Sequence, residues 1–220
     1  MTPGAVQLAK IVIDKKSVGA NWYFMLHPVK AVLVTCADKN GKPNVMSVGW
    51  NMPCSHKPWM VAIAVHPQRY SHKLISESKE FTVNVPTTEL AYQTQFCGEY
   101  SGRDVDKFKE SKLTPRPGKK VKVPFIEECI AFMECKVAGQ FETGDHTTFV
   151  GEIIYAEAEE DLIRIKPETR TIPDRYFDPS KCTLLYHLGA DAYVTISPKL
   201  YEPSVPPPAK SWKTEQLKED

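Results

Sequence analysis

The sequence predicts a mainly β fold in which two or three helices are inserted after strand ends. Short apolar runs rich in β-branched residues recur along the chain, and the turn segment D-K-N-G-K-P at 38–43 separates two of them. Segments with a helical pattern are few and short. Because many antiparallel strands leave edges with unpaired backbone groups, we expect the sheet to close into a barrel.

Each predicted strand is an apolar run bounded by turn residues. Asn40-Gly41 lies at the centre of the first turn and predicts a hairpin. The run at Trp59–Val65 is apolar on both faces, which predicts a central strand. A loop, Q-F-E-T-G-D-H, joins the two longest runs. In chain order the predicted strands are Ala31–Cys36, Asn44–Trp50, Trp59–Val65, Phe81–Val85, Ile130–Ala138, Thr147–Ala158, Leu162–Ile165 and Thr183–Leu188.

Three segments have helix signals. Ser71–Ser78 is predicted as a short helix with Ser71 as its N-cap. Pro86 ends the preceding strand, and Thr87 or Thr88 is expected to cap a helix that runs to about Phe96. In S-G-R-D-V-D-K-F-K-E-S-K-L, which begins at residue 101, the first Ser and Asp have the spacing of a capping box.

Composition limits the classes of function. The formal net charge of the 220 residues is +1, so no broad basic field suggests a nucleic-acid partner. No apolar run approaches the ~20 residues that span a bilayer, and the first residues lack the apolar stretch of a signal peptide, so we expect no membrane contact and a cytoplasmic location. The six cysteines form no C-x-x-C pair and are expected to be buried, reduced thiols without a metal.

The chain changes character near its end. From Glu202 the sequence is E-P-S-V-P-P-P-A-K-S-W-K-T-E-Q-L-K-E-D, in which three successive prolines favour an extended form. We therefore expect a domain over 1–201 and a Pro-rich tail over 202–220, either disordered or lying over a neighbouring subunit.

The segment that begins at His66, H-P-Q-R-Y-S-H, directly precedes a predicted helix. A helix N-terminus offers unpaired N–H groups and a positive dipole end. Arg69 adds a planar fork suited to phosphate oxygens, and Ser71 and His72 add donors in the first turn. These residues describe a phosphate site; an ordinary capped helix with a surface arginine is the alternative.

Three further segments contain candidate site residues. Ser47 and Gly49 would let a flat ligand approach a strand, or would serve close strand packing. Arg103 and Lys107 lie four apart and would share one helix face, either as a ligand site or as a solvated face balanced by aspartates. His146 could polarise a ligand or be a turn histidine beside Asp145. No G-x-G-x-x-G or G-x-x-x-x-G-K-[ST] motif occurs, so no Rossmann domain of this chain would hold a nicotinamide cofactor.

Four strings occur together in a recognisable order: KPNVMSVGWNMPCSHKPWMVAIAV, RYSHKLISESKEFTVNVP, FCGEYSGRDVDKF and GDHTTFVGEI. Over about residues 24–190 the chain resembles the flavin reductase-like, FMN-binding split-barrel family, and within it the flavoredoxin-like branch. The resemblance implies a six-stranded antiparallel Greek-key barrel that forms a homodimer and binds FMN near the subunit interface.

The resemblance also implies roles for individual residues. FMN contacts are expected along Met46, Ser47, Val48, Gly49, Trp50 and Asn51, and phosphate contacts from Arg69, Ser71 and His72. Ser101, Arg103 and Asp104 match the family string and are expected to close the site. His146 matches the histidine of the family's G-D-H string and is the expected catalytic residue. Many members carry Thr or Ser where this chain has Met46 and Val48, so backbone groups must contribute more to flavin recognition.

Three functions remain open at this point. The first is an FMN-dependent oxidoreductase that takes electrons from NADH or NADPH. The second is an electron carrier of the flavoredoxin type that a redox partner protein reduces, which the absence of a nicotinamide motif favours. The third is a non-catalytic barrel that binds another phosphate-bearing ligand or is purely structural.

Overall fold

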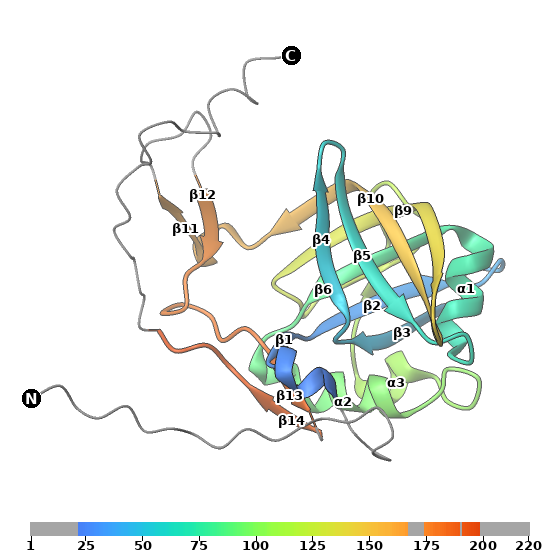
Figure 1. Ribbon diagram of the computed structural model, residues 1–220, viewed down its shortest axis with the longest axis horizontal. Coiled ribbons are helices and arrows are strands. Elements are labelled where there is room, and N and C mark those ends of the chain that lie inside the picture. Colours follow the sequence, from blue (N-terminus) through green and yellow to red (C-terminus); the bar gives the residue numbers. More distant parts are fainter. Residues whose placement is uncertain (1–21, 167–173, 190, 199–220) are drawn as a thin grey trace, which may run out of the picture.

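The computed structural model describes residues 22–166, 174–189 and 191–198 (Figure 1). It is mainly β with a few short helices, which confirms the predicted fold class. The N-terminal half contains η1 (Trp22–Leu26), β1 (Val29–Lys30), β2 (Val32–Ala37), β3 (Pro43–Val48), β4 (Asn51–His56), β5 (Trp59–Val65), α1 (Tyr70–Ser78), β6 (Glu80–Val85), η2 (Thr88–Leu90) and α2 (Ala91–Glu99). The remaining elements are α3 (Lys107–Ser111), β7 (Pro115–Arg116), β8 (Phe125–Ile126), β9 (Ala131–Thr143), β10 (His146–Ala158), η3 (Glu160–Leu162), β11 (Ile163–Lys166), β12 (Asp174–Phe177), β13 (Tyr186–Gly189) and β14 (Ala192–Val194).

The main sheet is antiparallel, with the strand order β3-β2-β6-β9-β10-β5-β4. It contains seven strands, whereas the resemblance implied six, because β4 extends it beyond β5. The sequence pattern did not predict β4, since its polar residues and Pro53 do not read as a strand. Trp59–Val65 has the predicted bounds but lies next to the edge strand β4.

The two edges of this sheet are joined by a sharp corner in the chain. β3 and β4 lie at opposite ends of the strand order, and only Gly49 and Trp50 separate them. The Ala64 N–H donates to the Trp50 carbonyl at 3.0 Å, and the Asn51 carboxamide donates to the Lys30 and Val48 carbonyls at 2.8 and 3.1 Å. The sheet must therefore curl until its two edges meet.

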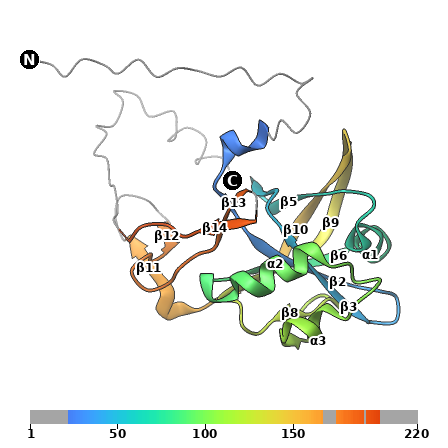
Figure 2. The ribbon, with the colours of Figure 1, turned by 90° about the horizontal axis from the view of Figure 1, so that it is seen from below.

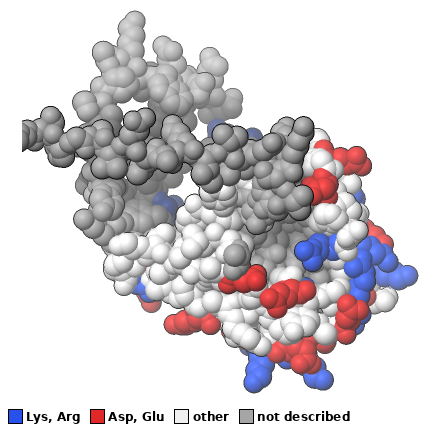
Figure 3. Space-filling view, turned by 60° about the horizontal axis from the view of Figure 1, so that its bottom comes forward, with Lys and Arg blue, Asp and Glu red and all other residues white. Residues whose placement is uncertain are grey.

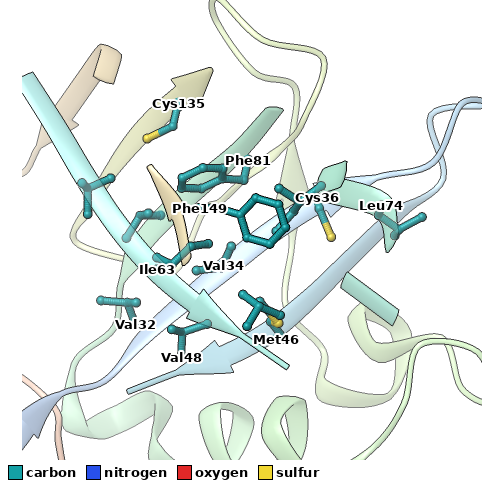
Figure 4. Close-up of a cluster of buried hydrophobic side chains, with 14 residues drawn as sticks. Val32, Val34, Cys36, Met46, Val48, Ile63, Leu74, Phe81, Cys135 and Phe149 are labelled. Carbon is teal, nitrogen blue, oxygen red and sulfur yellow. The ribbon is translucent and has the colours of Figure 1, made fainter. Parts of the chain in front are cut away.

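The curled sheet encloses an apolar core (Figure 4). Phe81 and Phe149 are fully buried there between strands of both edges. The other labelled side chains that point into this core are Val32, Val34, Cys36, Met46, Val48, Ile63, Leu74 and Cys135. Leu33 points to the opposite face of β2 and packs in a second cluster with Phe108 of α3. Burial of both faces of β2 explains its continuous apolar sequence.

The helices and the smaller sheets surround the main sheet. α2 and α3 lie below β2 and β3 in the view of Figure 1, whereas β11 and β12 project from the side opposite to α1 (Figures 1 and 2). β13 pairs with β1 and β14, and β7 pairs with β8. Within the described residues no helix is both long enough and apolar enough to cross a membrane.

Several local predictions are confirmed. β2 and β3 form the predicted hairpin, and Gly41 has the positive φ of +82° that its turn requires. β9 and β10 form the predicted long hairpin, although β9 continues to Thr143. The helix expected after Pro86 is present as η2 followed by α2.

Two helix starts differ from the prediction. The N-cap of α1 is Arg69, not Ser71, whose buried hydroxyl instead accepts a hydrogen bond from Asn44. The third helix begins at Lys107 with Asp106 as its N-cap, so the capping box from Ser101 to Asp104 is wrong. The Ser101 hydroxyl accepts from the Arg103 N–H in a turn before that helix, and this turn lines a cavity.

The predicted burial of the cysteines is confirmed at five of the six positions. All six thiols are free, and five are buried, whereas Cys54 on β4 is exposed. The boundary expected near residue 201 and the Pro-rich tail lie outside the described residues.

Candidate functional site: a cationic cavity beside the sheet corner

A cavity of about 550 Å³ opens where β3, the start of α1 and the segment between α2 and α3 meet. This volume lies within the range of about 300–1,000 Å³ that is usual for ligand pockets. Its lining residues are Asn44, Met46, Ser47, Val48, Gly49, Trp50, Ala64, Val65, His66, Gln68, Arg69, Tyr70, Ser71, Cys97, Gly98, Tyr100, Ser101, Gly102, Arg103, Lys107 and His146.

The cavity has a strongly cationic lining. Arg69, Arg103 and Lys107 contribute to its wall, and no carboxylate is present among the described residues that line it. By contrast, acidic and basic side chains are both present over the molecular face in Figure 3, so the positive charge of the cavity is local. An anionic ligand would offset the mutual repulsion of these three charges.

The two arginines differ in how they are held. Arg103 donates to the Gln68 carbonyl at 2.9 Å, and its guanidinium lies 5.3 Å from the centre of the Tyr70 ring. The Arg69 side chain makes no hydrogen bond or ion pair with any residue in the described part of the chain. Arg69 therefore keeps its donors available for a ligand.

Lys107 is a buried cation with a 6% exposed surface. Its ammonium group donates to the Val45 carbonyl at 2.9 Å and the Cys97 carbonyl at 2.7 Å. Burial lowers its pKa to about 8, and the neighbouring charge of Arg69 acts in the same direction. An ammonium group has three donors, so one remains beyond these two carbonyls, and Lys107 lines the cavity.

Asn44 connects three parts of the cavity wall. Its carboxamide lies at the start of β3 and donates to the Ser71 hydroxyl at 2.7 Å. A Cβ atom on Gly102 would lie 2.0 Å from Asn44 Oδ1, so residue 102 must be glycine for the loop to pack this closely. β3, α1 and the loop before α3 therefore meet at one side chain.

Aromatic rings line the solvent-exposed part of the cavity around Trp50, which is 40% exposed, and we call this part the mouth. The centres of the Trp50 and His146 rings are 4.7 Å apart, and those of His66 and His146 are 5.3 Å apart. His146 Nδ1 forms a 2.7 Å hydrogen bond with Asp145, and this bond lowers the pKa of the carboxyl group. This contact holds the ring orientation, so Nε2 is the ring nitrogen that remains for a hydrogen bond to a ligand.

Comparisons with known proteins bear directly on this cavity. The profile of the flavin reductase like domain family matches residues 24–189, which include every residue that lines it. The chain belongs to the flavin reductase-like family.

Solved structures and relatives of the family agree with this assignment. Flavoredoxin from Methanosarcina acetivorans is 27% identical with a TM-score of 0.70, over 96% of this chain and 100% of that one. A protein of Pyrococcus abyssi is 34% identical over 81% of this chain and 96% of its own length. A flavin reductase of Pseudomonas putida is 28% identical over 70% of this chain and 85% of its own length. The protein is therefore a flavin-binding, reductase-type split-barrel protein related to flavoredoxins.

The structure brings most of the predicted site residues of this flavin reductase-like protein together. The predicted site residues that line the cavity are Met46, Ser47, Val48, Gly49, Trp50, Arg69, Ser71, Ser101, Arg103 and His146.

Three predicted site residues do not line the cavity. Asn51 uses its side chain to hold the sheet corner. His72 contacts the Thr147 hydroxyl at 2.9 Å, and burial lowers its pKa. Asp104 is exposed, and its N–H donates to the Ser101 carbonyl.

Arg103 and Lys107 do not share a helix face as the sequence predicted. Arg103 precedes α3, whereas Lys107 is its first residue and is buried. The four-residue spacing was therefore a poor guide, because the chain between them is a turn rather than a helix.

Sequence reasoning missed Asn44, Tyr70, Gly102 and the buried position of Lys107. Asn44 reads as the first residue of a strand, and this pattern does not indicate that its side chain contacts the start of α1. The family-like string S-G-R-D-V-D-K-F contains both Gly102 and Lys107, and this was the signal that could have identified them. Nothing in the string indicates that the lysine is inserted under β3.

The lowered pKa of Lys107 predicts a pH-dependent stability difference in the ligand-free protein. The Lys107 amine has its ordinary pKa of 10.5 in the unfolded chain, so below pH 8 the amine is charged in both states and the folded protein bears the full cost of burying that charge. The penalty decreases as the pH rises from about 8 to 10.5. Wild type should therefore gain stability relative to Lys107→Met by on the order of 3 kcal/mol over this window, at ~1.4 kcal/mol per pKa unit.

Urea denaturation of both ligand-free proteins at pH 7, 8, 9 and 10 measures this difference. The comparison with the methionine variant cancels the titration of the cysteines and tyrosines common to both proteins. A stability difference that is constant from pH 7 to 10 would show that Lys107 has an ordinary pKa.

Proposed function

We propose that this protein is an FMN-dependent oxidoreductase that takes electrons from NADH or NADPH. The observation that carries the proposal is the cavity itself, which is lined by three cations, by no described carboxylate and by the Trp50–His146 aromatic pair. The flavoredoxin and flavin reductase relatives support a flavin as the anionic ligand.

The residues present fit the two ends of FMN. Arg69 and Ser71 at the start of α1 offer a free guanidinium and a hydroxyl, which suit the phosphate. The strand from Met46 to Trp50 offers backbone groups and a small residue at Gly49, which suit the polar edge of the flat ring system. When bound, FMN supplies the redox chemistry by accepting a hydride and passing on electrons.

The chain's own groups would set the electrostatics of the reaction. Lys107 brings a buried positive charge to the cavity wall, and such a charge stabilises negative charge that develops on a bound ligand. His146, oriented by Asp145 through Nδ1, keeps its Nε2 available beside Trp50. We therefore assign His146 to proton exchange or to positioning of the electron donor.

An electron carrier of the flavoredoxin type is the second candidate. It is favoured by the 27% identity to the flavoredoxin structure over 96% of the chain and by the lack of a nicotinamide-binding motif. In this case a redox partner protein, not a nicotinamide, would reduce the flavin.

A single anaerobic titration distinguishes the two candidates. The protein is loaded with FMN, its visible spectrum is recorded, and NADH and then NADPH are added. Bleaching of the flavin absorbance within seconds supports the oxidoreductase. Absorbance that persists with both nucleotides but bleaches with a reduced ferredoxin supports the carrier and contradicts the oxidoreductase.

We also propose a homodimer. Support comes from large apolar side chains that are exposed on η1 and on the β4–β5 hairpin, namely Leu26 (67%), Trp59 (64%), Met52 (59%) and Trp22 (54%). Sedimentation velocity at micromolar concentration measures the oligomeric state. The cytoplasmic location and a tail lying across the dimer stay predictions.

Substitution of Arg69 tests the phosphate end of the cavity. Arg69→Ala should weaken FMN binding by roughly 1.5–3 kcal/mol, the range for a charge-assisted hydrogen bond, and should leave riboflavin binding unchanged. Isothermal titration or fluorescence quenching with both flavins gives the two affinities. Arg116→Ala is the matched control, because this exposed arginine pairs with Glu127 away from the cavity. Equal FMN affinities for wild type and Arg69→Ala would place the phosphate elsewhere.

Substitution of His146 tests the chemistry at the mouth. His146→Ala should slow anaerobic flavin reduction by NAD(P)H more than it weakens FMN binding, because the imidazole lies at the mouth rather than at the phosphate end. Stopped-flow reduction rates are compared with FMN dissociation constants for the same variant. A large loss of FMN affinity with an unchanged rate would make this histidine structural.

A further inference from the structure

We infer that Asn44 is a positioning residue that fixes the Ser71 hydroxyl as a hydrogen-bond donor toward the phosphate group of the flavin. The inference rests on the proposed function, since it requires a phosphate at the start of α1. Asn44 stands at the beginning of β3. The resemblance to the flavin reductase-like family implies no role for this residue.

The hydrogen bond between Asn44 and Ser71 has a defined direction. Asn44 and Ser71 are 4% and 2% exposed, and both line the cavity. The Asn44 carboxamide nitrogen donates to Ser71 Oγ at 2.7 Å. Because a hydroxyl has a single hydrogen, a serine that accepts from Asn44 must direct its own hydrogen elsewhere.

The hydroxyl hydrogen of Ser71 needs an acceptor other than Asn44. Cys36 Sγ lies 3.8 Å from the Asn44 carboxamide nitrogen. Burial raises the pKa of this thiol to about 11, and the neighbouring Ser71 hydroxyl partly offsets that rise. A sulfur atom is a weak acceptor, whereas phosphate oxygens are strong acceptors and have no hydrogen to give except when protonated. A phosphate beside Ser71 would therefore be a stronger acceptor for this hydrogen than the neighbouring sulfur.

The Asn44 side chain is held from two sides. Gly102 packs against it so closely that an added Cβ would lie 2.0 Å from Asn44 Oδ1 and 2.8 Å from its Cγ. Ser71 restrains the other end of the carboxamide. The side chain therefore has little freedom to rotate, and it keeps the loop that carries Arg103 in register with the start of α1.

The chemical consequence is selectivity for a phosphorylated flavin. Without Asn44, the Ser71 hydroxyl could turn and act as an acceptor, which a phosphate cannot satisfy. The loss should be confined to ligands with a phosphate, because the contact between Asn44 and Ser71 lies at the Arg69 end of the cavity. A merely structural role would change the affinities for FMN and riboflavin together.

The experiment is a double-mutant cycle read with two ligands. Dissociation constants for FMN and riboflavin are measured with full-length wild type, Asn44→Ala, Ser71→Ala and the double variant. Asn40→Ala, in the exposed turn between β2 and β3, is the control for loss of a carboxamide.

We expect each single variant to bind FMN roughly tenfold more weakly, with riboflavin affinity within about twofold of wild type. The double variant should be no more than about twofold weaker than the weaker single variant, because both changes remove the same donor. An FMN affinity of the double variant that is about a hundredfold weaker than wild type would show that the two losses are independent, and it would overturn the inference. A ratio of FMN to riboflavin affinity that is unchanged in Asn44→Ala would also overturn it.

A second variant keeps the test decisive if Asn44→Ala folds poorly. Gly102→Ala retains the carboxamide but displaces it, so it should reduce the ratio of FMN to riboflavin affinity as Asn44→Ala does. A Gly102→Ala protein with the wild-type ratio would count against the inference. If wild type itself shows no preference for FMN over riboflavin, the phosphate site of the proposed function is wrong, and the role of Asn44 with it.

Discussion

The corner between β3 and β4 is the constraint on which the rest of the structure depends. These two strands are consecutive in the chain yet lie at opposite edges of the main sheet, so the sheet must curl to bring its edges together. The Asn51 side chain satisfies the Lys30 and Val48 carbonyls, and the Trp50 carbonyl accepts from Ala64. Backbone groups that an abrupt turn would leave unpaired are thereby satisfied.

The same corner positions the functional site. Because the chain turns at Gly49 and Trp50, the Trp50 ring stands at the mouth of the cavity and meets His146 from the far end of the β9–β10 hairpin. The residues between Met46 and Trp50 form one wall, while α1 and the loop before α3 form the others. Curling of the sheet thus brings together residues that are as far apart in the sequence as Asn44 and His146.

Charge gives this cavity its chemical character. Arg69, Arg103 and Lys107 adjoin it, and the lowered pKa of Lys107 reflects the cost of burying an ammonium group without a counter-ion. Elsewhere the protein satisfies a buried charge fully: the Glu134 carboxylate accepts from the N–H groups of Lys119, Lys120 and Val121. The contrast between a completed anion site in the core and an incomplete cation site in the cavity supports an anionic ligand.

The sequence by itself determined the fold class, the main hairpins and the family, because these depend on local signals. Alternating or continuous apolar runs mark strands, Asn40-Gly41 marks a turn, and the family strings lie in continuous stretches of chain. The same strings indicated ten of the residues that line the cavity. These strand and turn signals can be read from the sequence because backbone preferences depend on only a few neighbouring residues.

Only the tertiary structure decided which of those residues cap a helix, which are buried and which remain available to a ligand. Ser71 reads as a helix cap, but burial against Asn44 makes it part of a hydrogen-bond network, and Arg69 takes the cap position instead. Lys107 reads as a solvent-exposed helix residue, yet its ammonium group is inserted under β3 and bonded to two carbonyls. Burial and long-range hydrogen bonds depend on segments far apart in the chain, and no local pattern contains that information.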